Sequence, residues 1–263
     1  MSPYVTALTI AGSDSGGGAG IAADLKTLLD HGVFGMVAIT AVTAQNSRGV
    51  HRVDPVSVDG LIAQLRAVFD DFPVGAVKIG MLGAAAHVEA VASFLAALPE
   101  RPPIVLDPVM VASTGDRLLQ ADAERALAEE LLPLATVATP NLDEAAVLAG
   151  SPGRNAARAW AAGAPIPVLL TGGDVVGDTI TDELWQGGTA RRWTHPRQGN
   201  RAFHGTGCTL SSAIAARLAQ GAPLADAVDG AIGYTQALIG TGVHMGSVGG
   251  GNPSLPHGLR RDE

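Results

Sequence analysis

The sequence has very little of the residues that define several common protein classes. Cysteine occurs once, at Cys208, and aromatic residues make up 4% of the 263 residues. A single cysteine excludes an intramolecular disulfide, and without a Cys-x-x-Cys pair nothing indicates a zinc site. Proteins without disulfides are typical of reducing compartments. We therefore expect a cytoplasmic protein.

Positive charge is also scarce. The formal net charge is −8, and Lys26 and Lys78 are the only lysines. An acidic chain of this kind does not favour a nucleic-acid surface. No apolar run approaches the roughly 20 residues of a membrane span, and the N-terminus lacks the basic segment of a signal peptide. We expect neither nucleic-acid nor membrane partners.

What the sequence does have is 47% hydrophobic residues in an alternating pattern of short apolar runs and Ala/Leu-rich helical runs. Near-continuous apolar runs are typical of strands covered on both faces of a sheet. Strand–helix alternation over this length predicts a mainly parallel, doubly wound α/β sheet. The predicted strands lie at 5–10, 36–42, 75–82, 103–110, 134–141 and 167–173.

The pattern changes after residue 173. Segments 178–185 and 189–195 flank Gly187 and Gly188 and predict an antiparallel hairpin, followed by helices at 207–220 and 223–240. We find no linker or internal repeat and expect one domain over residues 1–245. The Gly/Pro-rich segment 246–263 is expected to be a flexible tail.

In such sheets, ligands bind outside the carboxyl ends of the strands. The first predicted strand ends in "AGSDSGGGAG" (11–20), a glycine-rich turn that could present backbone N–H groups to a polar ligand. It lacks the spacing of the dinucleotide fingerprint. It is not a P-loop either, because the chain contains no Gly-Lys pair.

Two further strand ends carry polar side chains. In "TAQNSRG" (43–49), the Gln45 amide could bind an amine beside a ring nitrogen, while Asn46 is also suited to capping a loop. Asp107, Asn141 and Glu144 follow other strands, where carboxylates could hold Mg²⁺ through waters. Helix N-capping is the competing interpretation, and it suits Asn141 best.

The most specific element is "HGTGC" (204–208), at the start of a predicted helix. Gly205 and Gly207 permit positive φ and close approach, so the N–H groups up to Cys208 would converge on an anion. A helix N-terminus also lowers the pKa of a thiol. A lone cysteine is more often a small buried apolar residue, but the glycines favour a functional one.

Six motifs together resemble a known family. "AGSDSGGGAGIAADLK", "TAQNSRGV", "KIGML", "DPVM", "TPNLDEA" and "HGTGCTLSSAIAA" occur in the order found in hydroxymethylpyrimidine (phosphate) kinases of thiamine biosynthesis, which belong to the ribokinase-like superfamily. The resemblance covers residues 5 to 240. It implies a three-layer α/β/α kinase that uses ATP and Mg²⁺ to phosphorylate 4-amino-5-hydroxymethyl-2-methylpyrimidine and then its monophosphate, acting as a homodimer.

The resemblance also implies roles for individual residues. Cys208 matches the proposed catalytic base, next to an anion hole formed by Gly205, Thr206 and Gly207. The remaining matches are pyrimidine-binding Gly12, Asp24, Gln45, Met81 and Val109; ATP- or phosphate-binding Asn141, Thr171 and Gly172; and metal-associated Asp107 and Glu144.

One departure and two alternatives remain. Relatives often have lysine where this chain has Thr171, so weaker ATP binding is expected. A pyridoxal kinase of the same superfamily would bind a similar flat aromatic alcohol, although the Gln45 amide favours the aminopyrimidine. A ligand-binding protein without catalysis is the third possibility, and the intact "HGTGC" argues against it.

Overall fold

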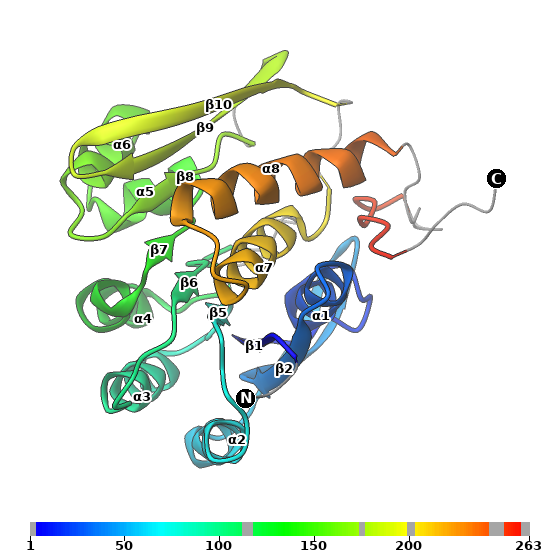
Figure 1. Cartoon of the computed structure of the whole chain (residues 1–263), viewed down its shortest axis with the longest axis vertical. Coiled ribbons are helices and arrows are strands. Elements are labelled where there is room, and N and C mark those ends of the chain that lie inside the picture. Colours follow the sequence, from blue (N-terminus) through cyan, green and yellow to red (C-terminus); the bar gives the residue numbers. More distant parts are fainter. Residues whose placement is uncertain (1–3, 112–117, 174–176, 199–202, 242–249, 259–263) are drawn as a thin grey trace.

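The computed structural model describes residues 4–111, 118–173, 177–198, 203–241 and 250–258. Eight strands form one sheet in the order β10-β9-β8-β7-β6-β5-β1-β2 (Figure 1). The strands β2, β1, β5, β6, β7 and β8 run parallel to one another in this sheet. Strands β9 and β10 extend it in antiparallel pairing. The strands are β1 (Thr6–Ala11), β2 (Phe34–Ile39), β5 (Val77–Ile79), β6 (Ile104–Leu106), β7 (Val137–Ala138), β8 (Val168–Leu170), β9 (Thr179–Gln186) and β10 (Thr189–Pro196).

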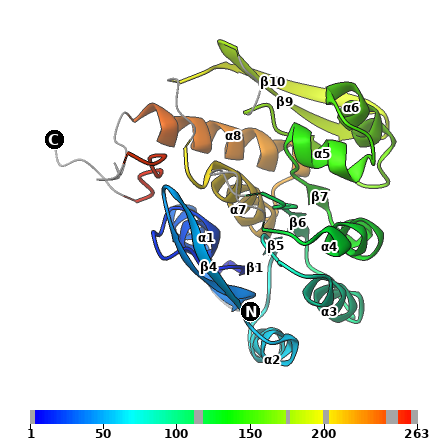
Figure 2. The same cartoon turned by 180° about the vertical axis from the view of Figure 1, so that it is seen from behind.

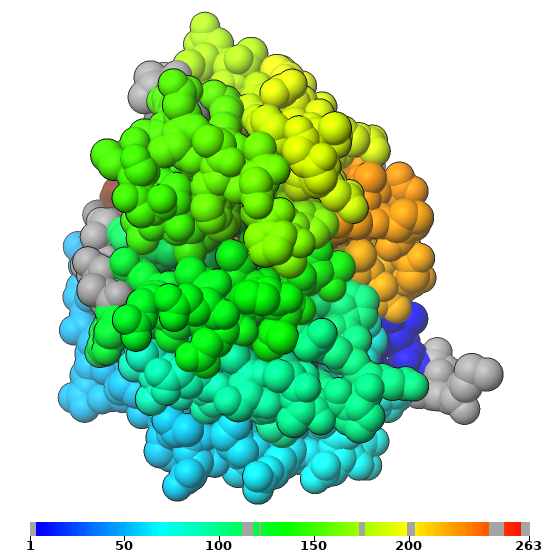
Figure 3. Space-filling model, turned by 90° about the vertical axis from the view of Figure 1, so that its left-hand side faces the viewer, coloured from blue at the N-terminus to red at the C-terminus, as the bar shows by residue number. Residues whose placement is uncertain are grey.

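Helices cover both faces of this sheet, as Figures 1 and 2 show. One face carries α1 (Gly20–Asp30), α7 (Thr206–Ala219) and α8 (Leu224–Gly240). The other carries α2 (Val58–Phe69), α3 (Ala85–Ala96), α4 (Ala121–Ala126), α5 (Leu142–Leu148) and α6 (Arg154–Gly163). On that side, Figure 3 shows α2, α3 and the green α4–α6 region as successive bands. The predicted three-layer α/β/α architecture with a mainly parallel sheet is confirmed.

The apolar strands fill two cores because successive side chains alternate between the faces of the sheet. On β1, Ala7 packs into the core beneath α7 and α8, whereas Leu8 and Ile10 pack into the core beneath α2 and α3. All three are fully buried. Both faces of a central strand are therefore covered, which is why the sequence shows mainly apolar runs rather than alternation.

One predicted strand is split in the structure. Strand β2 ends at Ile39, and the chain continues as β3 (Ala41–Asn46), which pairs antiparallel with β4 (Gly49–Pro55) in a separate two-stranded sheet. The sequence did not predict β4, because most of its residues are exposed and show no core-facing alternation. This hairpin brings Gln45 to the carboxyl end of the main sheet.

The expectation of a flexible C-terminal tail is wrong for residues 250–258. Leu255 and His257 are only 3% and 5% exposed. The backbone here finds fixed partners, since Asn252 N donates to Ser47 O and Gly258 N donates to Asp30 Oδ2. Residues 246–249 and 259–263 lie outside the described part of the chain. Among the described residues, no helix is both long and apolar enough to span a membrane.

Candidate active site

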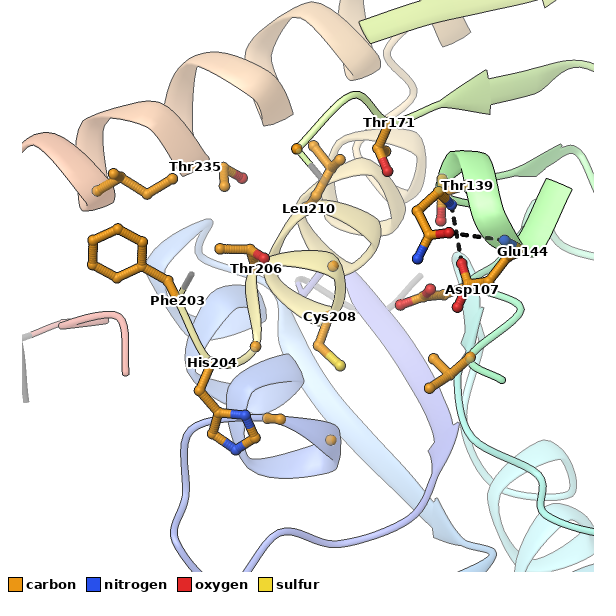
Figure 4. A pocket seen from close by; sticks show the side chains of 18 of the residues that line it. Asp107, Thr139, Glu144, Thr171, Phe203, His204, Thr206, Cys208, Leu210 and Thr235 are labelled. Carbon is orange, nitrogen blue, oxygen red and sulfur yellow. Dashed lines mark hydrogen bonds between the residues drawn. The ribbon is translucent and has the colours of Figure 1, made fainter. Parts of the chain in front are cut away.

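A cavity of about 340 Å³ lies at the carboxyl ends of the central parallel strands. Its wall takes Gly12 from the end of β1, Met81 from beyond β5, Asp107 from the end of β6 and Thr171 from the end of β8. The start of α7 lies among them (Figure 4). The predicted convergence of these strand ends is confirmed, and the volume suits a small ligand.

Most of the residues singled out from the sequence line this cavity. They are Gly12, Gln45, Met81, Asp107, Val109, Asn141, Glu144, Thr171, Gly205, Thr206, Gly207 and Cys208. Asp24 and Gly172 do not line it in this structure.

Asp24 is fully buried below the cavity, and all of its hydrogen-bonding capacity is directed to the protein. Its Oδ1 accepts from Ser212 Oγ at 2.8 Å, and its Oδ2 accepts from Thr9 Oγ1 at 2.6 Å. Lys78 Nζ donates to both oxygens, at 2.9 and 3.0 Å. A carboxylate held in this way supports the site from beneath rather than contacting a ligand.

Gly172 lies at a close crossing of two chain segments. Its N–H donates to Asp182 Oδ1 at 2.9 Å, and a Cβ atom there would overlap the Thr181 carbonyl. Glycine is therefore required by packing. The residue lines a separate cavity of about 250 Å³, on the other side of the segment that contains Thr171.

The "HGTGC" segment forms the sharp turn into α7 that the sequence predicted. Gly205 is the N-cap residue with φ +88°, and a Cβ there would overlap the Gly18 carbonyl. Thr209 N donates to Gly205 O, which leaves the N–H groups of the preceding residues without a partner inside the helix. We call residues 205–208 the anion turn. An anion bound here would receive these N–H groups and the positive end of the helix dipole.

Cys208 does not have the thiolate character expected from its place at a helix N-terminus. Burial raises the pKa of the thiol to about 12, and the carboxylates Asp24 and Asp107 add to the rise. The ammonium of Lys78 and the N–H of Gly20 act in the opposite direction without cancelling it. The thiol is therefore protonated at neutral pH in the ligand-free protein.

Lys78 connects the carboxylates beneath the cavity. Its side chain is 1% exposed, and Nζ lies 4.0 Å from Asp107 Oδ2. Burial opposes its charge, but the carboxylates Asp24 and Asp107 raise the pKa of the ammonium, so it remains charged. Burial raises the pKa of Asp107, while Lys78 and a 3.0 Å hydrogen bond from Ser211 Oγ oppose that rise.

Asn141 and Glu144 form the N-cap of α5, as the competing interpretation held for Asn141. Asn141 Oδ1 accepts from the N–H groups of Asp143 and Glu144, and Glu144 Oε2 accepts from Asn141 N at 3.0 Å (Figure 4). Glu144 Oε1 also accepts from Met110 N. Both side chains border the cavity while they fix the first turn of the helix.

The described residues contain no cluster of three or more His, Cys, Asp or Glu side chains that would cage a metal ion. Mg²⁺ usually binds through one or two carboxylates, with waters and substrate phosphates completing its shell. Asp107 fits that use, because its carboxylate borders the cavity while Ser211 holds its Oδ2. Glu144 lies on the same wall.

The sequence interpretation missed the pair Asp14–His204. Asp14 Oδ1 accepts from Gly16 N and Oδ2 from Gly18 N and Ala19 N, and His204 Nε2 lies 2.8 Å from Oδ2. Burial raises the pKa of Asp14, but His204 and the N–H groups of Gly16 and Ala19 lower it overall. An acidic residue within a glycine-rich turn was the available signal, since exposed N–H groups need an acceptor.

The wall near Thr171 is built differently. It combines apolar side chains with Arg197, whose Nε donates to Gly177 O and whose Nη2 donates to Gly173 O. Its apolar members are Ile180, Phe203, Leu210, Ile232 and Ile239. Asp182 supports this wall, with Oδ2 lying 3.1 Å from His195 Nε2.

Comparison with known proteins identifies the class of protein that carries this fold and site. The sequence model of the family described as phosphomethylpyrimidine kinase matches residues 14–252. The hydroxymethylpyrimidine/phosphomethylpyrimidine kinase of Rhizobium meliloti (strain 1021) is 48% identical over 95% of this chain and 96% of the relative. The chain therefore belongs to the phosphomethylpyrimidine kinase family and is a kinase, as its sequence predicted.

Solved structures agree with this assignment. The phosphomethylpyrimidine kinase of Clostridium difficile 630 superposes with a TM-score of 0.77 at 36% identity, over 89% of this chain and 99% of that one. A Bacillus subtilis pyridoxal kinase, solved as an ADP complex, superposes with a TM-score of 0.85 at 36% identity, over 96% and 97%. The ribokinase-like fold is thus shared with kinases of two related substrates.

Proposed function

We propose that this protein phosphorylates 4-amino-5-hydroxymethyl-2-methylpyrimidine, and then its monophosphate, with Mg-ATP in thiamine diphosphate biosynthesis. The observation that carries the proposal is the position of the anion turn, between a cavity wall with a fixed amide and a wall of apolar side chains. Phosphoryl transfer needs this order of alcohol site, phosphate site and nucleotide site.

The proposed pyrimidine site lies between Gly12, Gln45, Met81 and Val109. A Cβ on Gly12 would lie 3.3 Å from Met81 Sδ, so glycine leaves room for a flat ring beside the sulfur. The Gln45 backbone is fixed, because Ser15 Oγ donates to its carbonyl at 2.7 Å and accepts from its N–H at 3.0 Å. From this fixed backbone, the side-chain amide would pair with an amine and the adjacent ring nitrogen.

The proposed nucleotide site is the wall of Thr171 and the apolar residues around Phe203. Apolar side chains suit the flat base, and ATP use is supported by the ADP complex of the structurally similar Bacillus subtilis kinase. The phosphates would lie toward Thr171, Asn141 and the anion turn. Mg²⁺ would be held from the protein side by Asp107 and Glu144, and would neutralise charge on the phosphates.

Catalysis in this arrangement depends on positioning and on fixed donors. The anion turn supplies N–H groups where charge develops on the transferred phosphoryl group. Cys208 is the proposed acceptor of the proton that the attacking hydroxyl loses. Because its pKa is about 12 in the ligand-free protein, only a small thiolate fraction is available at neutral pH. Lys78, beneath it, favours that thiolate.

Pyridoxal phosphorylation is the second candidate, favoured by the 0.85 TM-score to a pyridoxal kinase. The 48% identity to a pyrimidine kinase favours the first. An assay of ADP release with the pyrimidine, its monophosphate and pyridoxal separates them, with mass spectrometry of the products. We expect turnover of both pyrimidines and less of pyridoxal. Turnover of pyridoxal alone, or of no substrate, would overturn the proposal.

The proposal also includes action in the cytoplasm as a homodimer with small-molecule partners only. The negative net charge supports the absence of a nucleic-acid partner. Exposed apolar side chains near the β2 edge of the sheet support self-association: Phe34, Phe72, Val42 and Val53. Light scattering of the purified protein tests the dimer, and a monomer at micromolar concentration would contradict it.

A further inference from the structure

The segment Gly251–Gly258, here called the C-terminal strap, contacts the β3–β4 hairpin, the residue before α7's N-cap and the end of α1. Asn252 N donates to the carbonyl of Ser47, at the tip of the β3–β4 hairpin. Gly258 N donates to Asp30 Oδ2 at the end of α1. Both ends of the strap are thus fixed, and Figures 1 and 2 show it in red beside α1.

The middle of the strap contacts His204, the residue before the anion turn, through backbone and packing. His204 N donates to Pro253 O at 2.9 Å, and His204 and Ser254 form a parallel β-bridge. A Cβ on Gly18 would overlap both Ser254 Oγ and the His204 ring. The strap, the glycine-rich turn and the residue that precedes the anion turn therefore meet at one closely packed point.

The end of the strap contacts the anion turn through a chain of buried hydrogen bonds. The Thr209 hydroxyl donates to Gly205 O at 2.9 Å, and its oxygen lies 2.8 Å from His257 Nε2. With the Thr209 hydroxyl proton directed to Gly205 O, the hydroxyl oxygen is left to accept from His257 Nε2. Thr209 and His257 are 0% and 5% exposed, so water cannot replace either partner.

The ring of His257 suits this role. Burial and the nearby Lys26 ammonium lower its pKa, although Asp30 and Asp24 oppose them, so the ring is neutral at pH 7. A neutral ring has a single N–H, and donation to Thr209 in this arrangement requires that proton to be on Nε2. The family sequence model matches only to residue 252, so this contact lies beyond the segment that identifies the family.

We propose that the C-terminal strap holds the anion turn in the geometry that phosphoryl transfer requires, with His257 as a positioning residue that acts through Thr209 on Gly205. The proposal rests on the proposed kinase function. Gly205 is the N-cap residue of α7 with φ +88°, and its carbonyl accepts from the N–H and the hydroxyl of Thr209 in the first helical turn. His257 contacts that hydroxyl from outside the helix, and a hydroxyl held in this way keeps the N–H groups of the anion turn pointed at one site.

The first test compares three single variants with the wild-type protein. His257→Leu removes the donor, His257→Gln retains an N–H at similar reach, and His51→Leu on exposed β4 is the matched control. We expect His257→Leu to lower kcat by about 10–100-fold, the range for a displaced catalytic group, with KM for ATP unchanged. His257→Gln should restore most of kcat, and His51→Leu should match the wild type.

The second test uses the other partner of the bond. Thr209→Val should lower kcat as His257→Leu does, and the double variant should be no worse than Thr209→Val. Additive losses, or a folded His257→Leu or Thr209→Val protein with wild-type kcat, would overturn the proposal. If His257→Leu does not fold, Thr209→Val and His257→Gln still decide the outcome.

A third readout does not depend on kinase activity. Cys208 is the only cysteine, so its alkylation by iodoacetamide reports the geometry of the anion turn. We expect faster alkylation in His257→Leu than in the wild type or His51→Leu. An unchanged rate of alkylation would contradict the proposed positioning role of the strap. A wild-type protein that turns over no pyrimidine would contradict the proposed function alone.

Discussion

The two walls of the cavity are held by different forces. On the side of Gly12 and Gln45, buried carboxylates fix the structure: Asp14 holds the glycine-rich turn, and Asp24 with Lys78 supports the floor. On the side of Thr171, apolar side chains dominate and backbone carbonyls accept from Arg197. Fixed donors and acceptors select a ligand by its polar pattern, whereas an apolar wall selects by shape. The proposed pyrimidine and nucleotide sites differ in this way.

The largest expected effect is at the boundary between the two walls. Cys208→Ala should lower kcat by about 10²–10⁴-fold, the range for loss of a general base, with KM for ATP nearly unchanged. Because only the thiolate accepts a proton and the pKa is about 12, wild-type kcat should rise with pH from about pH 6 to pH 9. The measurement is a pH–rate profile of both proteins.

A flat wild-type profile, together with an alanine variant within a few-fold of wild type, would contradict the role of Cys208 as a base. Such a result fits a loose transition state that needs little proton removal. Catalysis would then depend on the anion turn, and Cys208 would be a packed residue at the start of α7.

The next effect tests whether the pyrimidine side depends on its buried ions. Lys78→Met leaves Asp24 without a cation in a fully buried position. Removing one partner of a buried ion pair costs about 3–5 kcal/mol, so the free energy of unfolding should fall by that amount in urea titrations. Lys26→Met is the control, because Lys26 is exposed and is the only other lysine. Equal stability of the two variants would show that the ion pair does not support the floor.

A smaller effect is expected on the pyrimidine side of the cavity, where Gln45 should discriminate between the two substrates. Gln45→Leu should lower kcat/KM for the aminopyrimidine. The activation free energy derived from kcat/KM should rise by about 1–3 kcal/mol, the cost of one lost bidentate contact, and the effect on pyridoxal should be smaller. Steady-state kinetics with both substrates measure this. Asn46→Ala is the control, because Asn46 Oδ1 accepts from Arg48 N and only caps the hairpin. Equal losses on the two substrates would exclude recognition by the amide.

The smallest effect concerns the nucleotide side. Thr171→Lys should lower KM for ATP by up to about fivefold, the worth of an exposed ion pair, because it restores the lysine common in relatives. ATP titration at fixed Mg²⁺ measures this, with Thr179→Lys as a control outside the main cavity. An unchanged KM would mean that another cation already serves the phosphates. Arg197 would then be the candidate, because Arg191 and Arg192 do not line the cavity.

The sequence by itself determined the features that depend on neighbouring residues. Apolar runs predicted the covered parallel strands, and glycine at 205 predicted a turn that permits positive φ. The order of the motifs also determined the family. Apart from the order of the motifs, these signals are local, because propensity and backbone conformation are set within a few residues.

Only the tertiary structure decided which partners the polar residues have. Ser212 and Asp24 are 188 positions apart, and His204 and Asp14 are 190 apart, yet each pair shares a buried hydrogen bond. Burial raised the pKa of Cys208 against the expectation from its helix N-terminus, and it fixed the segment around His257 that composition marked as flexible. Desolvation and pairing depend on everything packed around a group, and a sequence pattern records only what precedes and follows it.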